Sequence, residues 1–508
     1  MPNDTDSKSV PDGASAAGPS PNPKGKMKAD KFAELIRGGK APCPSIRTVS
    51  GDVDLTGVRF PAVLSMKNVK FTGKVNFSQT RFKRGLEFIG CRFKKGLNLS
   101  DARVEGPLTL SSSRFDGDLN LTGARIEGSV TLNGARVKGN LNLWNASIGG
   151  SLFANPDPDS KGPFHAEGDF VMIGAEIENA VDFSGARLEG KVTADNASVG
   201  GSFFAAVDAN SGLRFLAKYD VSVIGSAIEG DLNLSGACFA GNLILDGTSV
   251  GGEIVATVDT NSRLPCRVKG DFSLMSGTIA RDLCFEAAHI GGDLQLQSVS
   301  IGGNLFLTPP TSVDKRNRPS VVGKKAWLLG AYIKGDLDIS GARIGDDLMM
   351  QNARVGQNFR AKIMSGFEPE IGGETWLISA KIDGTMEFAG VTMKRDLILD
   401  AASINSDLLI GFDLDESRDW RIVPSNVRGK FHALSATIGG DVTLMGLRSQ
   451  PGDNAASADQ VPTGSTGQLW AVDFSGAQIK GMFSMYSGNL IEDTLKAKEA
   501  EIVTANMR

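Results

Sequence analysis

The sequence predicts an all-β fold, a parallel β-helix in which short strands wind around one axis and stack coil upon coil. Two observations predict it: an eleven-residue period that runs through most of the 508-residue chain, and a strand-like alternation of apolar and polar residues within each period. The stretch TGARIEGSVTLNGARVKGNLNL at 122–143 shows both, because GARIEGSVTL is followed eleven residues later by GARVKGNLNL. Its four glycines and β-branched residues disfavour a long helix, so the repeat consists of strands.

The N-terminal segment precedes the repeat and divides into two parts. Residues 1–27 are rich in Pro, Ser, Gly and Asn and poor in apolar residues, which predicts a disordered tail. Residues 28–40 contain DKFAELIRGG, which predicts a short helix with Asp30 as its cap and Gly38 at its end. We expect this helix to cover the first coil.

Residues 50–154 form an uninterrupted run of repeats with two columns of apolar residues. The first column is Phe60, Phe71, Phe82, Phe93, Val104, Phe115, Ile126, Val137 and Ile148. The second column is Leu55, Met66, Phe77, Phe88, Leu99, Leu110, Leu121, Leu132 and Leu143. Each eleven-residue unit therefore supplies two short strands and two corners. Two units, or 22 residues, would close one four-sided coil, with like residues stacked at roughly 4.8 Å per coil.

Residues 155–485 continue the repeat but carry insertions. The insertions follow Ala154, Ala205, Ala256, Leu307, Ala361, Ile410 and Leu444. The first four of these points are 51 residues apart, an interval of two coils and seven extra residues. We therefore expect one loop at the same corner of every second coil, in a row with a spacing of about 10 Å. The repeats correspond to about 16 coils and a rod of roughly 75 to 80 Å.

The C-terminal residues 487–508 have a different pattern. Ile491, Leu495 and Ile502 stand at helical spacing, and Glu492 and Lys496 can form an ion pair along one helix face. The pattern predicts a second capping helix, which would protect the last coil from pairing with another edge.

The repeat resembles that of the pentapeptide-repeat family of right-handed quadrilateral β-helices, in which a small residue precedes a central Leu or Phe by two positions, as in Ala124-Arg125-Ile126. One extra residue in alternate repeats departs from that pattern and implies a variant with 22-residue coils. The chain is also similar to bacterial repeat proteins reading GARIxGDLxLxGA, some of which are labelled membrane-associated oxidoreductases. No flavin, nicotinamide or metal motif in the sequence supports that activity, and we expect no cofactor.

The overall composition excludes several classes of protein. The 54 Lys and Arg residues nearly balance the 58 Asp and Glu residues, so the net charge of −4 gives no general attraction to nucleic acid. The five cysteines include no CxxC pair, which indicates neither a disulfide framework nor a zinc site. No apolar run is long enough for a signal peptide or a membrane span. We expect an intracellular protein, in the cytoplasm or peripheral at the inner membrane surface.

A basic patch near the N-terminus is the first candidate binding surface. Outward-facing basic residues recur every eleven positions, and from residue 103 onward an acid two positions later usually balances them. Between 67 and 95 these acids are missing, and only Glu87 is present. The basic patch consists of Lys67, Lys70, Lys74, Arg81, Lys83, Arg84, Arg92, Lys94 and Lys95. Such a patch suits phospholipid headgroups of an anionic membrane, a nucleic-acid backbone or an acidic partner, and a solvated face is the alternative.

The row of loops is the second candidate surface. Its proposed partner-binding residues are Trp327, Trp376, Asp157, Asp159, Asp208 and Asp259. Both tryptophans stand six residues before a column residue, so we predict that they face outward at equivalent sites. Exposed tryptophans beside loops suit sugar stacking or a protein hot spot, unless the loops fold over them. The aspartates do not spell out a calcium-binding loop, and no metal site is assigned.

The sequence favours a non-catalytic protein. The three histidines, His165, His289 and His432, have no adjacent nucleophile motif, and no catalytic residue is assigned. We predict a β-helical scaffold that displays the loop row and the basic patch to a protein or membrane partner. One alternative is a carbohydrate-active enzyme, which needs loop carboxylates within about 5 to 10 Å of each other. Another is a nucleic-acid mimic of the kind known among pentapeptide-repeat proteins, which the mixed surface charge disfavours.

Overall fold

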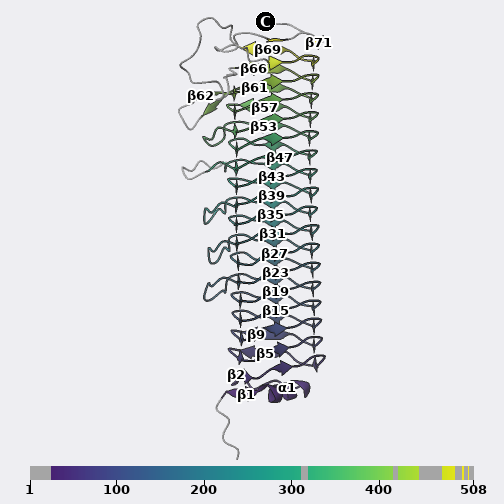
Figure 1. The fold of residues 1–508 in the computed structure, drawn as a ribbon, viewed down its shortest axis with the longest axis vertical. Helices are drawn as coiled ribbons and strands as arrows, with labels where there is room; N and C mark the ends of the chain where they lie inside the picture. The colour runs from purple at the N-terminus through teal and green to yellow at the C-terminus, as the bar shows by residue number, and fades with distance from the viewer. Residues whose placement is uncertain are drawn as a thin grey trace, which may run out of the picture.

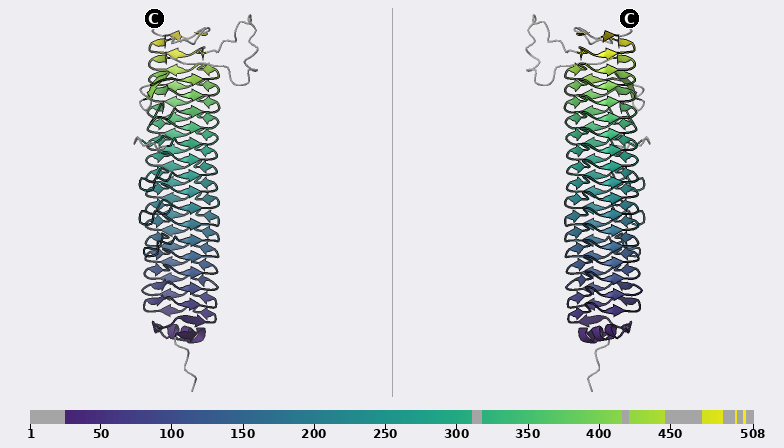
Figure 2. Two further views of the ribbon diagram at one scale, coloured as in Figure 1. Left: turned by 90° about the vertical axis from the view of Figure 1, so that its left-hand side faces the viewer. Right: turned by 90° about the vertical axis from the view of Figure 1, so that its right-hand side faces the viewer.

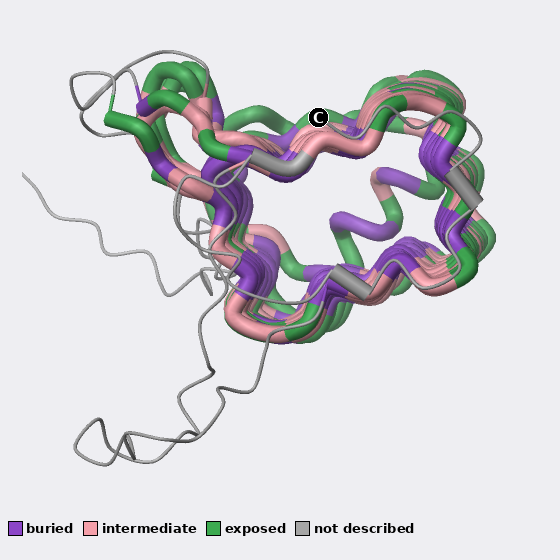
Figure 3. The backbone as a smooth tube through the Cα atoms, turned by 90° about the horizontal axis from the view of Figure 1, so that it is seen from above, coloured by how far each residue is buried: buried purple, intermediate pink, exposed green. Residues whose placement is uncertain are grey.

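The chain forms a straight rod of evenly stacked strands (Figures 1 and 2). The computed structural model describes residues 25–310, 318–415, 421–445 and 472–486, together with the strands at 495–496 and 501–502. Seen along its axis, the rod has a four-sided outline (Figure 3).

Each coil of the rod contributes one strand to each of four sheets. In the first complete coil these strands are β2 (Thr48–Ser50), β3 (Val53–Asp54), β4 (Arg59–Phe60) and β5 (Leu64–Lys67). We call the sheets that contain them A, B, C and D, in that order. The next strand, β6 (Lys70–Phe71), lies beside β2 in sheet A, and the chain then repeats the sequence of faces. Strands of one sheet pair in parallel with the coil before and the coil after, which gives 17 strands in sheet A and 18 in sheet B over the part of the chain that the structure describes. The predicted right-handed quadrilateral β-helix is confirmed.

The two apolar columns of the sequence form the core of the rod. Members 22 residues apart stack on the same sheet, as shown by the register of β10 (Arg92–Phe93), in which Phe93 lies between Phe71 and Phe115. The rings of these three phenylalanines are nearly parallel, with centroids 4.9 and 5.0 Å apart. Alternate members of the first column, such as Phe82, lie on the opposite sheet C. Every residue of both columns is buried.

The Gly-Asp pairs of the repeat turn the chain at two corners of the coil. The aspartate side chain accepts a hydrogen bond from the backbone N–H of the equivalent residue one coil later, as from Lys74 to Asp52 and from Asn140 to Asp118, each at 2.8 Å. The neighbouring glycine allows this close approach, since a Cβ at Gly252 would lie 2.0 Å from Oδ1 of Asp231. These corner aspartates therefore stabilise the backbone and link successive coils.

A helix covers the N-terminal end of the rod. Helix α1 (Ala29–Arg37) lies within the predicted range, ends at Gly38 and buries Phe32 and Ile36 against the first coil. The predicted cap is wrong, because Lys28 precedes the helix and Asp30 lies in its first turn. The predicted disordered tail also ends too late, since β1 (Lys26–Lys28) pairs with β2 in sheet A. Residues 1–24 lie outside the described part of the chain.

The predicted C-terminal helix is wrong where residues 487–508 are described. Strand β70 (Leu495–Lys496) pairs with β67 (Val472–Asp473) in sheet B, and β71 (Glu501–Ile502) pairs with β68 (Gln478–Ile479) in sheet C. The seven-residue interval from Leu495 to Ile502 suits a helix, but it is also the interval from Val472 to Ile479 across one corner of the coil. With these added strands, the sheets that contain β70 and β71 each have 18 strands among the described residues, more than the expected number of about 16 coils.

The described insertions all leave the corner between sheets D and A, where they form the row seen on the left of Figure 1. We number them loop 1 (154–164), loop 2 (205–215), loop 3 (256–266), loop 4 (307–320), loop 5 (362–369) and loop 6 (411–425). Loops 1 to 6 leave alternate coils, as the 51-residue interval predicts. A seventh insertion, 446–471, follows β66 (Val442–Met445) in the very next coil and lies outside the described residues.

Candidate functional site

The aspartates of loops 1 to 3 hold the shape of their own loops. A backbone N–H three residues later donates a 2.7 Å hydrogen bond to the carboxylate of Asp157, Asp208 and Asp259 alike. Asp159 contributes its backbone N–H to Asp157 at 3.1 Å. Three of the four aspartates predicted to bind a partner, Asp157, Asp208 and Asp259, therefore use their carboxylates to form Asx-type turns.

The carboxylate of Asp157 also joins its loop to the rod. It accepts hydrogen bonds from the Ser112 hydroxyl and from the backbone N–H of Ser160, and these lower the pKa of Asp157 below its ordinary value. Within the described residues, no three His, Cys, Asp or Glu side chains come together as a metal site would require.

We call the row formed by loops 1 to 6 the loop ridge, and hydrogen bonds join some of its neighbouring loops. Arg214 of loop 2 donates to the carbonyl of Pro265 in loop 3 at 2.9 Å. Ser365 of loop 5 donates to the carbonyl of Pro310 in loop 4 at 2.8 Å. Gly185 lies at the corner of the coil between loops 1 and 2, and both loops approach it closely. A Cβ at Gly185 would lie 2.7 Å from the Pro156 ring of loop 1 and 3.0 Å from Cβ of Asp208 in loop 2. Loops 2 and 3, and likewise loops 4 and 5, are therefore held to each other rather than projecting independently.

Loop 6 is a β-hairpin, formed by the outer part of β61 (Leu408–Asp415) and by β62 (Arg421–Pro424). The two strands are antiparallel, with Leu414 opposite Ile422 and Phe412 opposite Pro424. One face is apolar and open to solvent: Phe412 is 42% exposed, Leu414 41% and Ile422 63%. We call this surface the hairpin apolar face.

The opposite face of the hairpin packs against the protein although it carries charged residues. Asp415 and Val423 are buried. The carboxylate of Asp413 accepts the backbone N–H of Ile363 in loop 5 at 3.0 Å, which joins loops 5 and 6. The usual polarity of a surface hairpin is thus inverted, with two aspartates turned inward and three large apolar side chains turned outward.

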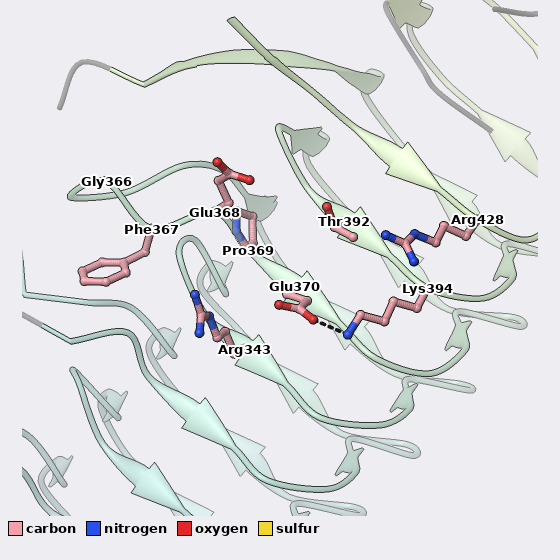
Figure 4. A pocket seen from close by; sticks show the side chains of 9 residues that line it. All are labelled: Arg343, Gly366, Phe367, Glu368, Pro369, Glu370, Thr392, Lys394 and Arg428. Atoms are coloured by element: carbon pink, nitrogen blue, oxygen red, sulfur yellow. Dashed lines mark ion pairs between the residues drawn. The ribbon is translucent and has the colours of Figure 1, made fainter. Parts of the chain in front are cut away.

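A polar groove lies between loop 5 and sheet A. It has a volume of about 430 Å³ and is shown in Figure 4. Its floor comes from successive strands of sheet A: β50 (Arg343–Ile344), β54 (Glu370–Ile371), β58 (Thr392–Met393) and β63 (Asn426–Val427). Its wall is residues 366–369 of loop 5. Lys394 forms a 2.5 Å ion pair with Glu370, and Arg421 of the hairpin lies 3.6 Å from Glu368.

The two tryptophans face outward at equivalent sites but not beside the loops. Trp327 in β47 (Ala326–Trp327) and Trp376 in β55 (Thr375–Trp376) lie on sheet B, two coils apart, whereas the loops leave the corner between sheets D and A. Both are half-buried. The Lys325 ammonium lies 5.6 Å above the Trp327 ring, and Trp376 Nε1 donates to Glu374 at 2.5 Å. The prediction that they line the loop edge is wrong, because the eleven-residue period does not reveal which of the four faces a residue occupies.

The predicted basic patch is divided between opposite faces and partly neutralised. Arg81 and Lys83 lie on sheet C, where both form ion pairs with Glu105. Arg92 and Lys94 lie on sheet A, where each is 3.0 Å from Asp116. The other five residues, Lys67, Lys70, Lys74, Arg84 and Lys95, have no ion pair among the described residues. The expectation that Glu87 alone opposes these nine residues is therefore wrong.

The acids that neutralise the patch belong to the next coil. They are therefore missed when acids are sought two positions after each basic residue. Glu105 and Asp116 each stand 24 residues after the arginine they bind, one coil and two residues further on. Partial burial raises the pKa of Asp116, but hydrogen bonds from Arg92, Lys94 and Arg114 outweigh it and hold the pKa well below the ordinary range. Glu105 is affected in the same direction by Arg81 and Lys83.

The five cysteines are free thiols in different environments. Burial raises the pKa of Cys91 to about 11 and that of Cys266 to about 12. Cys43 is exposed, and hydrogen bonds with Ser45 lower the pKa of its thiol.

Comparison with known proteins finds a match for one part of the repeat region. Residues 48–103 match the family model described as pentapeptide repeats (9 copies). Together with the four parallel sheets, this match supports the resemblance to pentapeptide repeats over these residues of the β-helix. No curated protein and no solved structure matches the chain. Among the described residues, no helix is long and apolar enough to cross a bilayer.

Proposed function

We propose that the protein is a non-catalytic scaffold that binds a protein partner along the loop ridge, with the hairpin apolar face as the main contact. The observation that carries this proposal is the inverted polarity of loop 6. Phe412, Leu414 and Ile422 form a contiguous apolar surface in solvent while Asp413 and Asp415 face the protein. An exposed apolar patch of this kind is typical of an interaction surface.

The rigidity of the ridge supports the same function. Binding costs less when the contact surface is already ordered, since fewer side chains and loops lose freedom on association. The hairpin is anchored to loop 5 through Asp413, and loop 5 is anchored to loop 4 through Ser365. Each loop in turn leaves a coil whose strands are hydrogen-bonded to the coils on either side. A partner would therefore meet a surface of fixed shape, with large apolar anchors at one end.

The local contacts give less support to the alternative of a carbohydrate-active enzyme. The carboxylates of Asp157, Asp208 and Asp259 are each engaged within their own loop, and Lys325 covers one face of the Trp327 ring that a sugar would need. A nucleic-acid mimic would need a row of free acids, whereas many acids of the rod bind either a basic side chain or a backbone N–H of the next coil.

The proposal is tested by affinity capture from an extract of the source organism, with the full-length protein as bait. A Phe412→Ser, Ile422→Ser variant removes the hairpin apolar face, and Ile224→Ser is the matched control because Ile224 is 41% exposed on another face. We expect a partner captured by wild type and by Ile224→Ser to be lost from the double variant. Equal capture by all three proteins would contradict the proposal.

A further inference from the structure

Cys238 begins β34 (Cys238–Phe239) on sheet A, between the strands that follow loops 2 and 3. Its neighbours are β30 (Leu216–Ala217) after loop 2 and β38 (Arg267–Val268) after loop 3. Phe239 is buried in the core, whereas the Cys238 side chain faces outward and is half-buried. Sheet A therefore presents this thiol on the outer surface of the rod, beside the loop ridge.

Arg267 is the residue beside Cys238 on the next strand of sheet A. Adjacent strands of a sheet lie about 4.8 Å apart, so the two outward side chains start from neighbouring positions. The Arg267 side chain is half-buried, and its Nε is buried without a hydrogen-bond partner. Its guanidinium also has no ion pair among the described residues. An unpaired cation loses hydration when it is partly buried, so this position favours the approach of an anion.

Arg214 of loop 2 holds a second guanidinium next to the same strand. Its Nη2 donates to the carbonyl of Ala237, the residue before Cys238, at 2.7 Å and to that of Pro265 at 2.9 Å. These carbonyls fix the guanidinium in place but do not neutralise its charge. Burial lowers the pKa of Arg214, while Cys238 raises it and Arg267 lowers it, as expected for three groups that lie close together.

The neighbouring strands and loops supply no carboxylate to these two arginines. The outward positions within β30, β34, β38 and β42 (His289–Ile290) are Leu216, Cys238, Arg267 and His289. The acids of loops 2 and 3 are turned to their own loops, since Asp208 binds Ser211 and Asp259 binds Ser262. The Cys238 thiol thus lies beside two cations that have no ion pair within the described part of the chain.

We infer that Cys238 is a site of S-thiolation by small disulfides that carry carboxylates, which Arg267 and Arg214 attract to the thiol. The Cys238 thiol gives its proton to solvent, and its sulfur attacks one sulfur of the disulfide. A new S–S bond joins Cys238 to one half of the reagent, the S–S bond of the reagent breaks, and the other half leaves as a thiolate. The sulfur of Cys238 is thereby oxidised and the released half is reduced. This modification goes beyond the proposed scaffold function and does not depend on its partner.

The test compares three disulfides of different charge on the full-length protein: oxidised glutathione, which is anionic, hydroxyethyl disulfide, which is neutral, and cystamine, which is cationic. Peptide mass spectrometry follows the rate of mixed-disulfide formation at Cys238, with the exposed Cys43 as the internal reference. Arg267→Gln removes the neighbouring charge, and Arg267→Lys keeps it. Arg125→Gln is the matched control, because Arg125 also begins a strand, β16 (Arg125–Ile126), and has no ion pair among the described residues.

We expect Arg267→Gln to react with oxidised glutathione about threefold more slowly than wild type at Cys238, because one unit charge about 6 Å from the reagent changes its attraction by that factor in water. The same variant should react faster with cystamine and at an unchanged rate with hydroxyethyl disulfide. Added salt should reduce the first two effects. Arg267→Lys and Arg125→Gln should behave like wild type.

The inference is overturned if Arg267→Gln changes the rates of all three reagents alike or leaves them all unchanged, or if Arg125→Gln has the same effect. It is also overturned if Cys238 reacts only after unfolding. A disulfide between Cys238 and the buried Cys266, in place of the mixed disulfide, would overturn it as well.

Discussion

Replacement of Phe93 by alanine tests the stacked core of the rod. Phe93 is fully buried and contacts three other rings: Phe71 at 4.9 Å, Phe115 at 5.0 Å and Phe88 at 5.3 Å between centroids. Burial of a phenylalanine is worth about 3 to 5 kcal/mol relative to alanine, and each aromatic pair adds to the packing, so we expect a loss near 5 kcal/mol. The assay is equilibrium unfolding in guanidinium chloride, followed by circular dichroism.

Coils of a solenoid contact only their neighbours, so this loss should fall mainly on the N-terminal coils. We expect hydrogen exchange of backbone amides to accelerate around residues 70–115 more than around residues 230–300. The control is Phe412→Ala in the exposed hairpin, for which we expect a change of about 0.5 kcal/mol or less. A loss below about 1 kcal/mol for Phe93→Ala, or equal losses for the two variants, would refute the assignment of core and surface.

Three further predictions follow from the charges and thiols. Asp116 has a depressed pKa in the folded state, so its ion pairs stabilise the fold above about pH 4, and this stabilisation is lost as the pH falls through the folded-state pKa. The loss of stability caused by Asp116→Asn, measured in denaturant titrations, should therefore be smaller at pH 3 than at pH 7. An equal loss at both pH values would contradict the pairing. Iodoacetamide should modify Cys43 in the native protein but Cys91 and Cys266 only after unfolding, as peptide mass spectrometry can show; early labelling of Cys266 would contradict its burial. In sedimentation with vesicles that contain phosphatidylserine, we expect the same amount of bound protein for wild type and for a variant with Lys83→Glu, Arg84→Glu, Lys94→Glu and Lys95→Glu. The reason is that the basic patch is divided between opposite faces and partly paired. Selective sedimentation of wild type would restore the patch as a membrane surface.

The sequence was sufficient for the architecture because the same physical constraint recurs in every coil. A residue 22 positions away lies directly above or below, as Phe93 does above Phe71, so each inward position must remain apolar and the period is visible. The row of loops followed from the same regularity, since insertions at a constant interval must leave a constant corner.

The surface was less predictable because its contacts cross between coils and faces. Arg92 binds Asp116, 24 residues away, and a search for nearby acids along the chain does not find that pair. Trp327 fits the eleven-residue period, but that period does not say which of the four sheets a residue belongs to. Trp327 lies on sheet B, away from the corner where the loops leave. The alternation FDLD, followed by RIVP, did carry a signal for the hairpin. Its inverted polarity depends on the contact between Asp413 and Ile363, which the sequence does not reveal.

Site-specific photocrosslinking at the hairpin tests the central claim most directly. Benzoylphenylalanine in place of Phe412 should form a discrete crosslinked product with a partner protein in cells of the source organism. The same group in place of Ile224, which has nearly the same exposure on another face, should not. A product at position 412 alone would support a docking surface on the loop ridge. Equal products at both positions, or none at 412, would contradict it.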